Sequence, residues 1–455
     1  MTPLPALSRL ARPALAGLAL LLSLAARAAP AADDPLPRPL TLDRALAYAI
    51  GHSPALREVR EQLAQQEGVL LEASARRLPD VGVGASYSYT EPRQFEGIPG
   101  FDFVPLPNPN AWSVGVSIRQ LVYSGGGVDA RRRGAAERLA AAQSTLRGAI
   151  NRTILSVQMD FFNVLQAREQ IQVHEEALRV LESETAQARV RRDAGTGSDF
   201  DVLRAEVAVA NARPALVRAR NAWRAGQDAL RAELGATVAA SDDAETDLDV
   251  QGELAVPPLT LGLADALRAA REHRPELAAG ERLVAAGRDE VAAARAGSRP
   301  QVSLVGSYGV RKASYADSFG ETLNGVTLGA QVDWSIFDGK ATEARVQQAT
   351  ARAAQAAAAR DALALAIDLE VRNAHRAVAE AADLLASARK NVDAAAESLR
   401  LARVRLDAGT ANQLEVLAAQ SALTDARSNF TAAQHDYAVS AARLLQATGT
   451  NSIPE

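Results

Sequence analysis

Two kinds of hydrophobic periodicity divide this chain. In four short segments, apolar residues alternate one by one with small or polar residues, which is the period of a strand with one apolar face. These segments are residues 81–90, 112–122, 301–311 and 326–337. Each has about 10 residues, the length of a tilted strand that crosses an outer membrane. The pattern predicts four amphipathic strands.

The segment after each pair of strands has a sevenfold repeat instead. In the second half of the chain, large apolar residues occupy one position of the heptad and alanines occupy the position three residues later. The large residues are Val371, Val378, Leu385, Val392, Leu399 and Leu406, and the alanines are Ala374, Ala381, Ala388, Ala395 and Ala402. The first half is looser, with Val157, Val164, Ile171 and Leu178 at this spacing but Asp160 and His174 at two alanine positions. The repeat predicts coiled-coil packing of two long helices, over residues 125–191 and 340–406.

The two halves of the chain repeat one unit. Short motifs return in the same order, among them Pro39-Leu40-Thr41-Leu42 as Pro258-Leu259-Thr260-Leu261, and Asp193-Ala194-Gly195-Thr196 as Asp407-Ala408-Gly409-Thr410. Each unit is expected to consist of a helix, two strands, a long helix and a further helix. The first unit spans residues 36–238 and the second spans 257–450, and a polar, acidic connector over 239–256 separates them.

The shorter helices of the first unit match its long helix in length. Ser53-Pro54 is a capping residue followed by a first-turn proline, so a helix is expected to begin there and to run to about Arg77. The helix after the Asp-Ala-Gly-Thr turn is expected over 200–234, and its counterpart in the second unit over 413–447. End to end, the two shorter helices would reach roughly 90 Å, against roughly 100 Å for the long helix. The sequence therefore predicts a cylinder of continuous and composite rods.

The first 28 residues have the features of a cleaved export signal. Arg9 and Arg12 precede an apolar stretch, and Ala26-Arg27-Ala28 has the small-x-small pattern of a signal-peptidase site. Beyond residue 28, no uninterrupted apolar run approaches the ~20 residues of a membrane-spanning helix. We therefore expect an exported protein in which any membrane span consists of strands.

Four strands separated by such long helices cannot close a barrel alone, and an open sheet leaves two exposed edges. Three chains that each donate four strands would form a barrel of 12, a number found in membrane barrels. The expected fold class is mainly α with a small β part: a long α-helical coiled-coil barrel plus four transmembrane β-strands per chain, which would close a 12-stranded barrel if three chains assemble as a trimer. A half-buried sheet in a soluble sandwich is the alternative for the strands.

Composition argues against several other functions. The 455 residues include no cysteine, which excludes disulfides, thiolate metal sites, a cysteine nucleophile and a lipidated amino-terminal cysteine. A net charge of -4 and a pI near 5.9 argue against a nucleic-acid partner. The five histidines are dispersed, and Ser124-Gly125-Gly126-Gly127 lacks the Lys-Ser/Thr pair of a phosphate-binding loop. We expect no catalysis, no cofactor and no metal site.

The duplicated unit and its paired turns resemble the TolC-like outer-membrane efflux family, in its unlipidated branch. The shared features cover essentially the whole mature chain and include the residues after each turn, Asp201-Val202-Leu203 and Glu415-Val416-Leu417, and the closing Asn429-Phe430, Tyr437 and Leu444. The resemblance implies a homotrimer with its barrel in outer-membrane lipid and 12 helical rods around a periplasmic tunnel.

The same resemblance implies the function of a passive exit duct in a tripartite efflux or type I secretion system, for drugs, other small molecules or secreted protein. Its partners would be a periplasmic adaptor (membrane fusion) protein and an inner-membrane pump or ABC secretion transporter. The alternative is a non-conducting periplasmic coiled-coil scaffold or adaptor, which would not need four strands of membrane length.

The resemblance also places the functional residues at the two helix-to-helix turns. The residues expected at the periplasmic entrance or gate are Asp193, Asp201, Asp407 and Glu415, and those expected to contact the adaptor are Arg192, Gly195, Thr196, Arg405, Gly409 and Thr410. Carboxylates clustered around a narrow pore favour cations. The alternatives are glycines that only terminate helices and carboxylates that are only solvated.

Three positions depart from the family pattern. Ala418 stands where a second aspartate is usual, and Leu406 and Ala411 stand where the family carries the tyrosine and arginine that latch the entrance. Nearby arginines could supply substitute salt bridges, although arginines at a helix end also suit the helix dipole as a solvated face. These arginines are Arg191, Arg192, Arg403 and Arg405.

Overall fold

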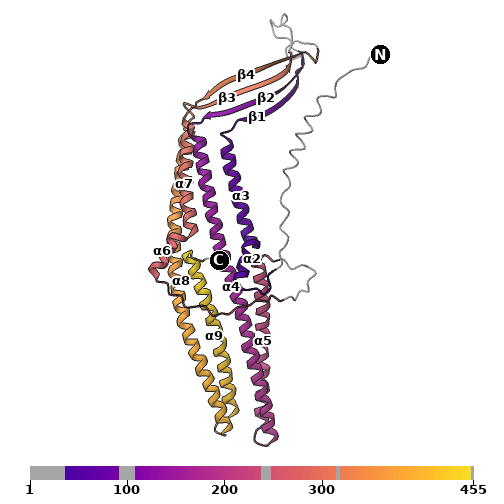
Figure 1. Cartoon of the computed structure of the whole chain (residues 1–455), viewed down its shortest axis with the longest axis vertical. Coiled ribbons are helices and arrows are strands. Elements are labelled where there is room, and N and C mark those ends of the chain that lie inside the picture. The colour runs from indigo at the N-terminus through magenta and orange to yellow at the C-terminus, as the bar shows by residue number, and fades with distance from the viewer. Residues whose placement is uncertain (1–35, 92–107, 237–246, 314–317, 452–455) are drawn as a thin grey trace, which may run out of the picture.

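The computed structural model describes residues 36–91, 108–236, 247–313 and 318–451. The chain is elongated, with a curved sheet at one end and helices along the rest of its length (Figure 1). The expected export signal lies outside the described residues, as do positions 239–246 of the expected connector. Within the described residues, no helix has both the length and the apolar content that a membrane crossing requires.

The two halves contain the same elements in the same order. The first half consists of α2 (Leu42–His52), α3 (Pro54–Ala75), β1 (Asp80–Tyr89), β2 (Asn110–Tyr123), α4 (Gly127–Asp193) and α5 (Asp199–Leu234). The second half consists of α6 (Leu263–His273), α7 (Pro275–Arg295), the 3-10 turn η3 (Ala296–Ser298), β3 (Gln301–Lys312), β4 (Thr322–Asp333), α8 (Ala341–Asp407) and α9 (Gln413–Thr448). Except for β4, the expected long elements differ from these bounds by at most two residues.

A short helix that the sequence did not predict precedes the strands in each half. Ser53 and Arg274 stand before Pro54 and Pro275, and their ψ angles of 127° and 114° lie outside the helical region. A proline disfavours the helical conformation of the residue before it, so α2 and α6 end there and a new helix begins. The expectation of one helix before each pair of strands was therefore wrong. The short helices lie at mid-length, while α3 and α7 run to the sheet (Figure 1).

The four strands form one antiparallel sheet in the order β1-β2-β3-β4, so that β2 and β3 join the two halves. Residues directly opposite each other share a face of the sheet. On one face lie cross-strand rows of large apolar residues, such as Val83, Val116, Tyr308 and Val326. On the other face most residues are small or polar, with Leu121, Val305 and Leu323 as exceptions, and one row consists of Gly84, Gly115, Gly309 and Gly325. Within the described residues, the outer edges of β1 and β4 have no strand partner.

Strand β4 begins and ends four residues earlier than its expected range of 326–337. Gln301, the first residue of β3, follows Pro300 and pairs with Asp333, so β3 offers no backbone partner beyond that point. Trp334 leaves the sheet and donates its Nε1–H to the Ser298 carbonyl at 3.1 Å. The apolar pattern continues to residue 337, but the strand ends at Asp333 because the backbone beyond it has no pairing partner on β3.

The shorter helices stack end to end beside the long ones. Helix α5 ends at Gly235 against the start of α3, and α9 ends at Gly449 against the start of α7. Both glycines have a φ of 72°. A Cβ at Gly235 would overlap the His52 carbonyl oxygen, and one at Gly449 would lie 2.9 Å from the His273 carbonyl carbon. These close approaches admit only glycine, and they produce two composite rods, α5–α3 and α9–α7.

The heptad residues form the core of the end away from the sheet. Ala395, Leu399 and Ala402 of α8 pack against Val416 and Leu423 of α9. The largest apolar cluster lies at mid-length, where α2, α4, α5, α9 and the described part of the connector converge. Its fully buried side chains include Leu40, Val157, Phe161, Val164, Leu230 and Leu234. The turns that connect the long helices to α5 and α9 are thus held at the end of well-packed helix pairs.

Candidate functional site

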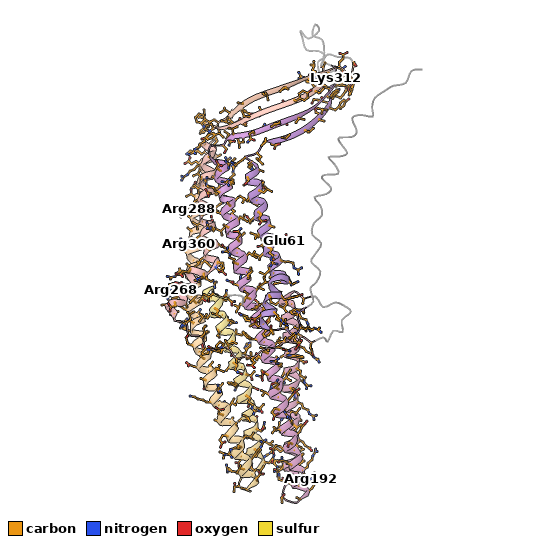
Figure 2. All side chains as sticks on the ribbon, viewed as in Figure 1. Glu61, Arg192, Arg268, Arg288, Lys312 and Arg360 are labelled. Atoms are coloured by element: carbon orange, nitrogen blue, oxygen red, sulfur yellow. The ribbon has the colours of Figure 1, made fainter. Side chains whose placement is uncertain are left out.

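The α4–α5 turn lies at the end of the molecule farthest from the sheet, where Arg192 is labelled in Figure 2. The Gly195 N–H donates to the Arg192 carbonyl at 2.9 Å, and the Thr196 N–H donates to the Arg191 carbonyl at 2.9 Å. Gly195 has a φ of 73°. This pair of hydrogen bonds around a left-handed residue is the Schellman ending of a helix. Gly195 and Thr196 themselves are exposed.

The α8–α9 turn repeats this geometry. The Gly409 N–H donates to the Leu406 carbonyl at 3.0 Å, the Thr410 N–H donates to the Arg405 carbonyl at 2.9 Å, and Gly409 has a φ of 71°. Gly409 and Thr410 are exposed as well. Each half therefore presents the same rigid, glycine-terminated turn at its tip.

Asp201 forms a capping box at the start of α5. The N–H and Oγ–H of Ser198 donate to Asp201 Oδ2 at 3.2 and 2.7 Å, and the Asp201 N–H donates to Ser198 Oγ at 3.2 Å. The hydrogen bonds from Ser198 hold the pKa of Asp201 below its usual value. The Ser-x-x-Asp spacing of a capping box is visible in the sequence, but the sequence analysis did not use it.

Glu415 occupies the equivalent position on α9 with a different environment. Its N–H donates to Asn412 Oδ1 at 3.1 Å, so Asn412 alone caps this helix. Its carboxylate lies 3.3 Å from Arg405, and both side chains are about half exposed. An exposed ion pair contributes little to stability, so the Glu415 carboxylate is available to solvent and ions.

Asp193 and Asp407, the other expected entrance residues, are exposed at the last residues of the long helices. Arg192 forms an ion pair with Asp193 at 2.7 Å. Leu406, at an expected latch position, packs at the edge of the α8–α9 core. In the described parts of the chain, no group of three or more His, Asp or Glu could hold a metal ion.

A polar network that the sequence analysis missed connects the two tips. Glu184 of α4 is 5% exposed and accepts hydrogen bonds from Arg403 Nε of α8 at 3.2 Å and from Gln413 Nε2 of α9 at 3.5 Å. Arg191 of α4 donates to Gln413 Oε1 at 2.6 Å. The network therefore joins the α4–α5 hairpin to the α8–α9 hairpin. Its partners come from different repeats, so no local pattern reveals it.

Apolar side chains surround these turns. Phe200, Leu203 and Leu414 lie in the first turns of α5 and α9, and between 48% and 60% of each is exposed. Val190, near the end of α4 and before the α4–α5 turn, is 68% exposed. The tips thus combine rigid turns, exposed charges and apolar side chains, which suits contact with another protein.

The fold agrees with comparisons to known proteins. The sequence profile described as "Outer membrane efflux protein" matches residues 45–236 and 266–450. Protein CyaE of Bordetella pertussis is 28% identical over 93% of this chain and 88% of its own length. The alkaline protease secretion protein AprF of Pseudomonas aeruginosa is 25% identical over 79% of this chain and 74% of its own length.

A solved structure has the same fold. The outer membrane channel CmeC of Campylobacter jejuni superposes with a TM-score of 0.76 at 17% identity, over 90% of this chain and 85% of that one. Because the family profile matches both repeats along most of their length, the chain belongs to the outer membrane efflux protein family.

Proposed function

We propose that three copies of this chain form a channel-tunnel in the outer membrane, the passive exit duct of a tripartite efflux or type I secretion system. The family membership and the secretion protein among its relatives support this function. The energy for transport would come from an inner-membrane pump or ABC transporter, reached through a periplasmic adaptor. We assign the chain no catalytic role.

The exposed apolar face of the sheet carries this proposal. Val83 and Leu328 are 77% and 81% exposed, and most of the other large side chains of this face are exposed to a smaller degree. Trp112, Val302 and Val310 are half-buried. Strands of 10 to 14 residues are long enough to cross a bilayer. An apolar outer face combined with a polar inner face is the pattern of a membrane barrel, and a second and third copy would pair the free edges of β1 and β4.

The distance between the sheet and the tips supports a role for the sheet in the outer membrane and a role for the tips in the periplasm. Helices α4 and α8 have 67 residues each, which corresponds to roughly 100 Å. With the sheet in the outer membrane, the tips would reach deep into the periplasm. We therefore propose that Arg192, Gly195 and Thr196 contact the adaptor, together with Arg405, Gly409 and Thr410.

Asp193, Asp201, Asp407 and Glu415 would surround the entrance in three copies. Within the described residues, Ser198 engages the Asp201 carboxylate, whereas Glu415 is paired only with an exposed arginine. Glu415 should therefore contribute more to the attraction of cations. A scaffold without a pore would show neither conductance nor selectivity.

Purified full-length protein tests the proposal in planar lipid bilayers, with native mass spectrometry for the oligomer. We expect trimers, stable single-channel currents and cation selectivity. Asp201→Ala and Glu415→Ala should weaken that selectivity, with the larger effect for Glu415→Ala, whereas Asp265→Ala on α6 should leave it unchanged. Monomers without conductance would refute the duct, and unchanged selectivity in both tip variants would refute the assignment of the gate.

A further inference from the structure

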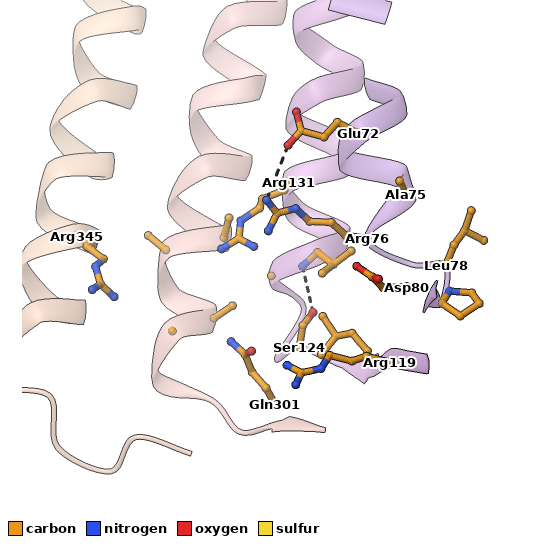
Figure 3. A pocket seen from close by; sticks show the side chains of 18 residues that line it. Glu72, Ala75, Arg76, Leu78, Asp80, Arg119, Ser124, Arg131, Gln301 and Arg345 are labelled. Atoms are coloured by element: carbon orange, nitrogen blue, oxygen red, sulfur yellow. Dashed lines mark hydrogen bonds and ion pairs between the residues drawn. The ribbon is translucent and has the colours of Figure 1, made fainter. Parts of the chain in front are cut away.

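A basic cleft lies where the sheet meets the helices. It has a volume of about 670 Å³, and its walls come from α3, the starts of β1 and α4, the end of β2, α7 and α8. Four arginines and two carboxylates line it, namely Arg76, Arg119, Arg131, Arg345, Glu72 and Asp80. Arg345 reaches in from α8 on the side opposite Arg76 and Arg119 (Figure 3).

The positive charges of the cleft are mostly uncompensated. Arg76 lies 3.9 Å from Glu72, at the limit of an ion pair. Among the described residues, the side chains of Arg119, Arg131 and Arg345 take part in no hydrogen bond or ion pair. The positive charge of Arg345 also acts on the carboxylate of Asp338, but Asp338 does not line the cleft. Four guanidinium groups against two carboxylates give the cleft a formal charge of +2, in a chain whose net charge is -4.

The excess positive charge extends into an adjoining cleft of about 320 Å³. The two clefts share Arg131 and Arg345, and the second adds Arg138, Arg352 and a single carboxylate, Glu290. Both added arginines bind this carboxylate, at 3.0 and 3.2 Å. Arg131 and Arg345 therefore stand between two clefts, and neither cleft neutralises them.

The larger cleft opens on the polar face of the sheet. Arg119 is directly opposite Asp80 in the β1–β2 pair, and two residues before it Ser117 is opposite Gly82. Side chains two residues apart share a face, so Arg119 points to the side of the small and polar residues. This is the side away from the apolar face. In the trimer proposed above, it lines the passage.

We infer that this cleft binds the anionic groups, carboxylate or phosphate, of molecules that pass through the duct. Guanidinium groups recognise both oxyanions through paired hydrogen bonds, and a cleft with an excess of one sign of charge concentrates ions of the opposite sign. Three copies would place three such clefts around the passage. The inference rests on the proposed function, because only assembly turns the polar face inward. A lipid phosphate is the other source of the same chemistry.

Inorganic tripolyphosphate is a suitable probe, added to full-length protein in planar bilayers and, separately, titrated calorimetrically into the detergent-purified protein. We expect it to block the wild-type current. Arg119→Gln, Arg131→Gln and Arg345→Gln together should weaken block and binding about tenfold, since an exposed ion pair contributes about a factor of two. Arg345→Gln alone, on an exposed position of α8, should weaken them about twofold. Arg268→Gln on α6, which is labelled in Figure 2, is the matched control and should change nothing.

The outcomes separate this inference from the proposed function. Currents that the probe blocks equally in wild type and the triple variant would overturn the cleft and leave the duct standing. Absent currents together with variant-sensitive calorimetric binding would refute the duct and support the anion site. Block that disappears when phosphatidylglycerol is added to the bilayer would assign the site to lipid phosphate and overturn its assignment to molecules in passage.

Discussion

The glycines that join the composite rods allow a strict test of the architecture. Four glycines have nearly the same φ, which is 72° at Gly235 and Gly449, 73° at Gly195 and 71° at Gly409. Only the first two are crowded, because a Cβ at either would meet the backbone of the last residue of α2 or α6 within 3 Å, whereas nothing lies within 4 Å of a Cβ at the tip glycines. The four positions therefore differ in packing and not in backbone conformation.

Substitution by alanine should separate the cost of a left-handed backbone conformation from the cost of overpacking. A left-handed alanine costs about 1–2 kcal/mol relative to glycine, and this is the whole expected loss for Gly195→Ala and Gly409→Ala. Gly235→Ala and Gly449→Ala should lose a further 1–3 kcal/mol or so from overpacking, since His52 and His273 present rigid backbone.

Thermal unfolding followed by circular dichroism measures the difference, at one scan rate and one protein and detergent concentration because such proteins often unfold irreversibly. The two alanines at the rod junctions should lower the midpoint clearly more than the two at the tips. Equal losses at all four positions would show that the rods are not in tight contact, and would refute the composite-rod argument.

Three further predictions concern polar groups in the helices. Glu184→Ala should destabilise the tips by about 1–3 kcal/mol, because it leaves two donors without their buried acceptor, and Glu184→Gln should cost less in the same thermal scan. Burial raises the pKa of Asp160, and burial together with the charge of Asp160 raises that of Glu233. The ionised form of each group is therefore unfavourable in the folded protein, and the stability falls as the pH rises from the unfolded-state pKa through the raised folded-state pKa. Asp160→Asn or Glu233→Gln should stabilise the protein at neutral pH. If the two carboxylates repel each other, the double variant should gain less than the sum of the two single gains. Since the hydrogen bonds from Ser198 lower the pKa of Asp201, its contribution is present above the unfolded pKa and is lost as the pH falls through the folded one. Asp201→Asn should therefore speed hydrogen exchange at the start of α5 and reduce its acid sensitivity, whereas Asp199→Asn, which leaves the capping box intact, should not.

The long elements could be predicted because one period persists over many residues in each. The expected seam positions Val371, Val378 and Leu399 are all buried in the structure. The end of β4 could not be predicted in this way, because Ile336 and Phe337 continue an apolar pattern that the pairing of β3 does not follow. Periodicity describes which face of an element is apolar, whereas the ends depend on partners that are distant in sequence.

The candidate site was predictable to a smaller extent for the same reason. The glycine turns are local, so their motif located both tips correctly on the chain. The network of Glu184, Arg403 and Gln413 depends on three helices from two repeats, and the sequence near each residue contains no sign of it. The roles of Asp201 and Glu415 at an entrance came from family resemblance and stay predictions, although their different caps now explain why they should differ.

The row of glycines across the sheet determines how wide the proposed passage is at that level. Three copies of Gly84, Gly115, Gly309 and Gly325 would surround it with bare backbone, so no rotamer change could open it further. Gly115 must remain small, since a Cβ there would lie 3.0 Å from the Tyr308 carbonyl oxygen, but Gly84 and Gly325 have free space above them. Bulky residues at these two positions would narrow the proposed passage, and side chains of different sizes would set different limits on the size of the molecules that pass, while the strand pairing stays intact.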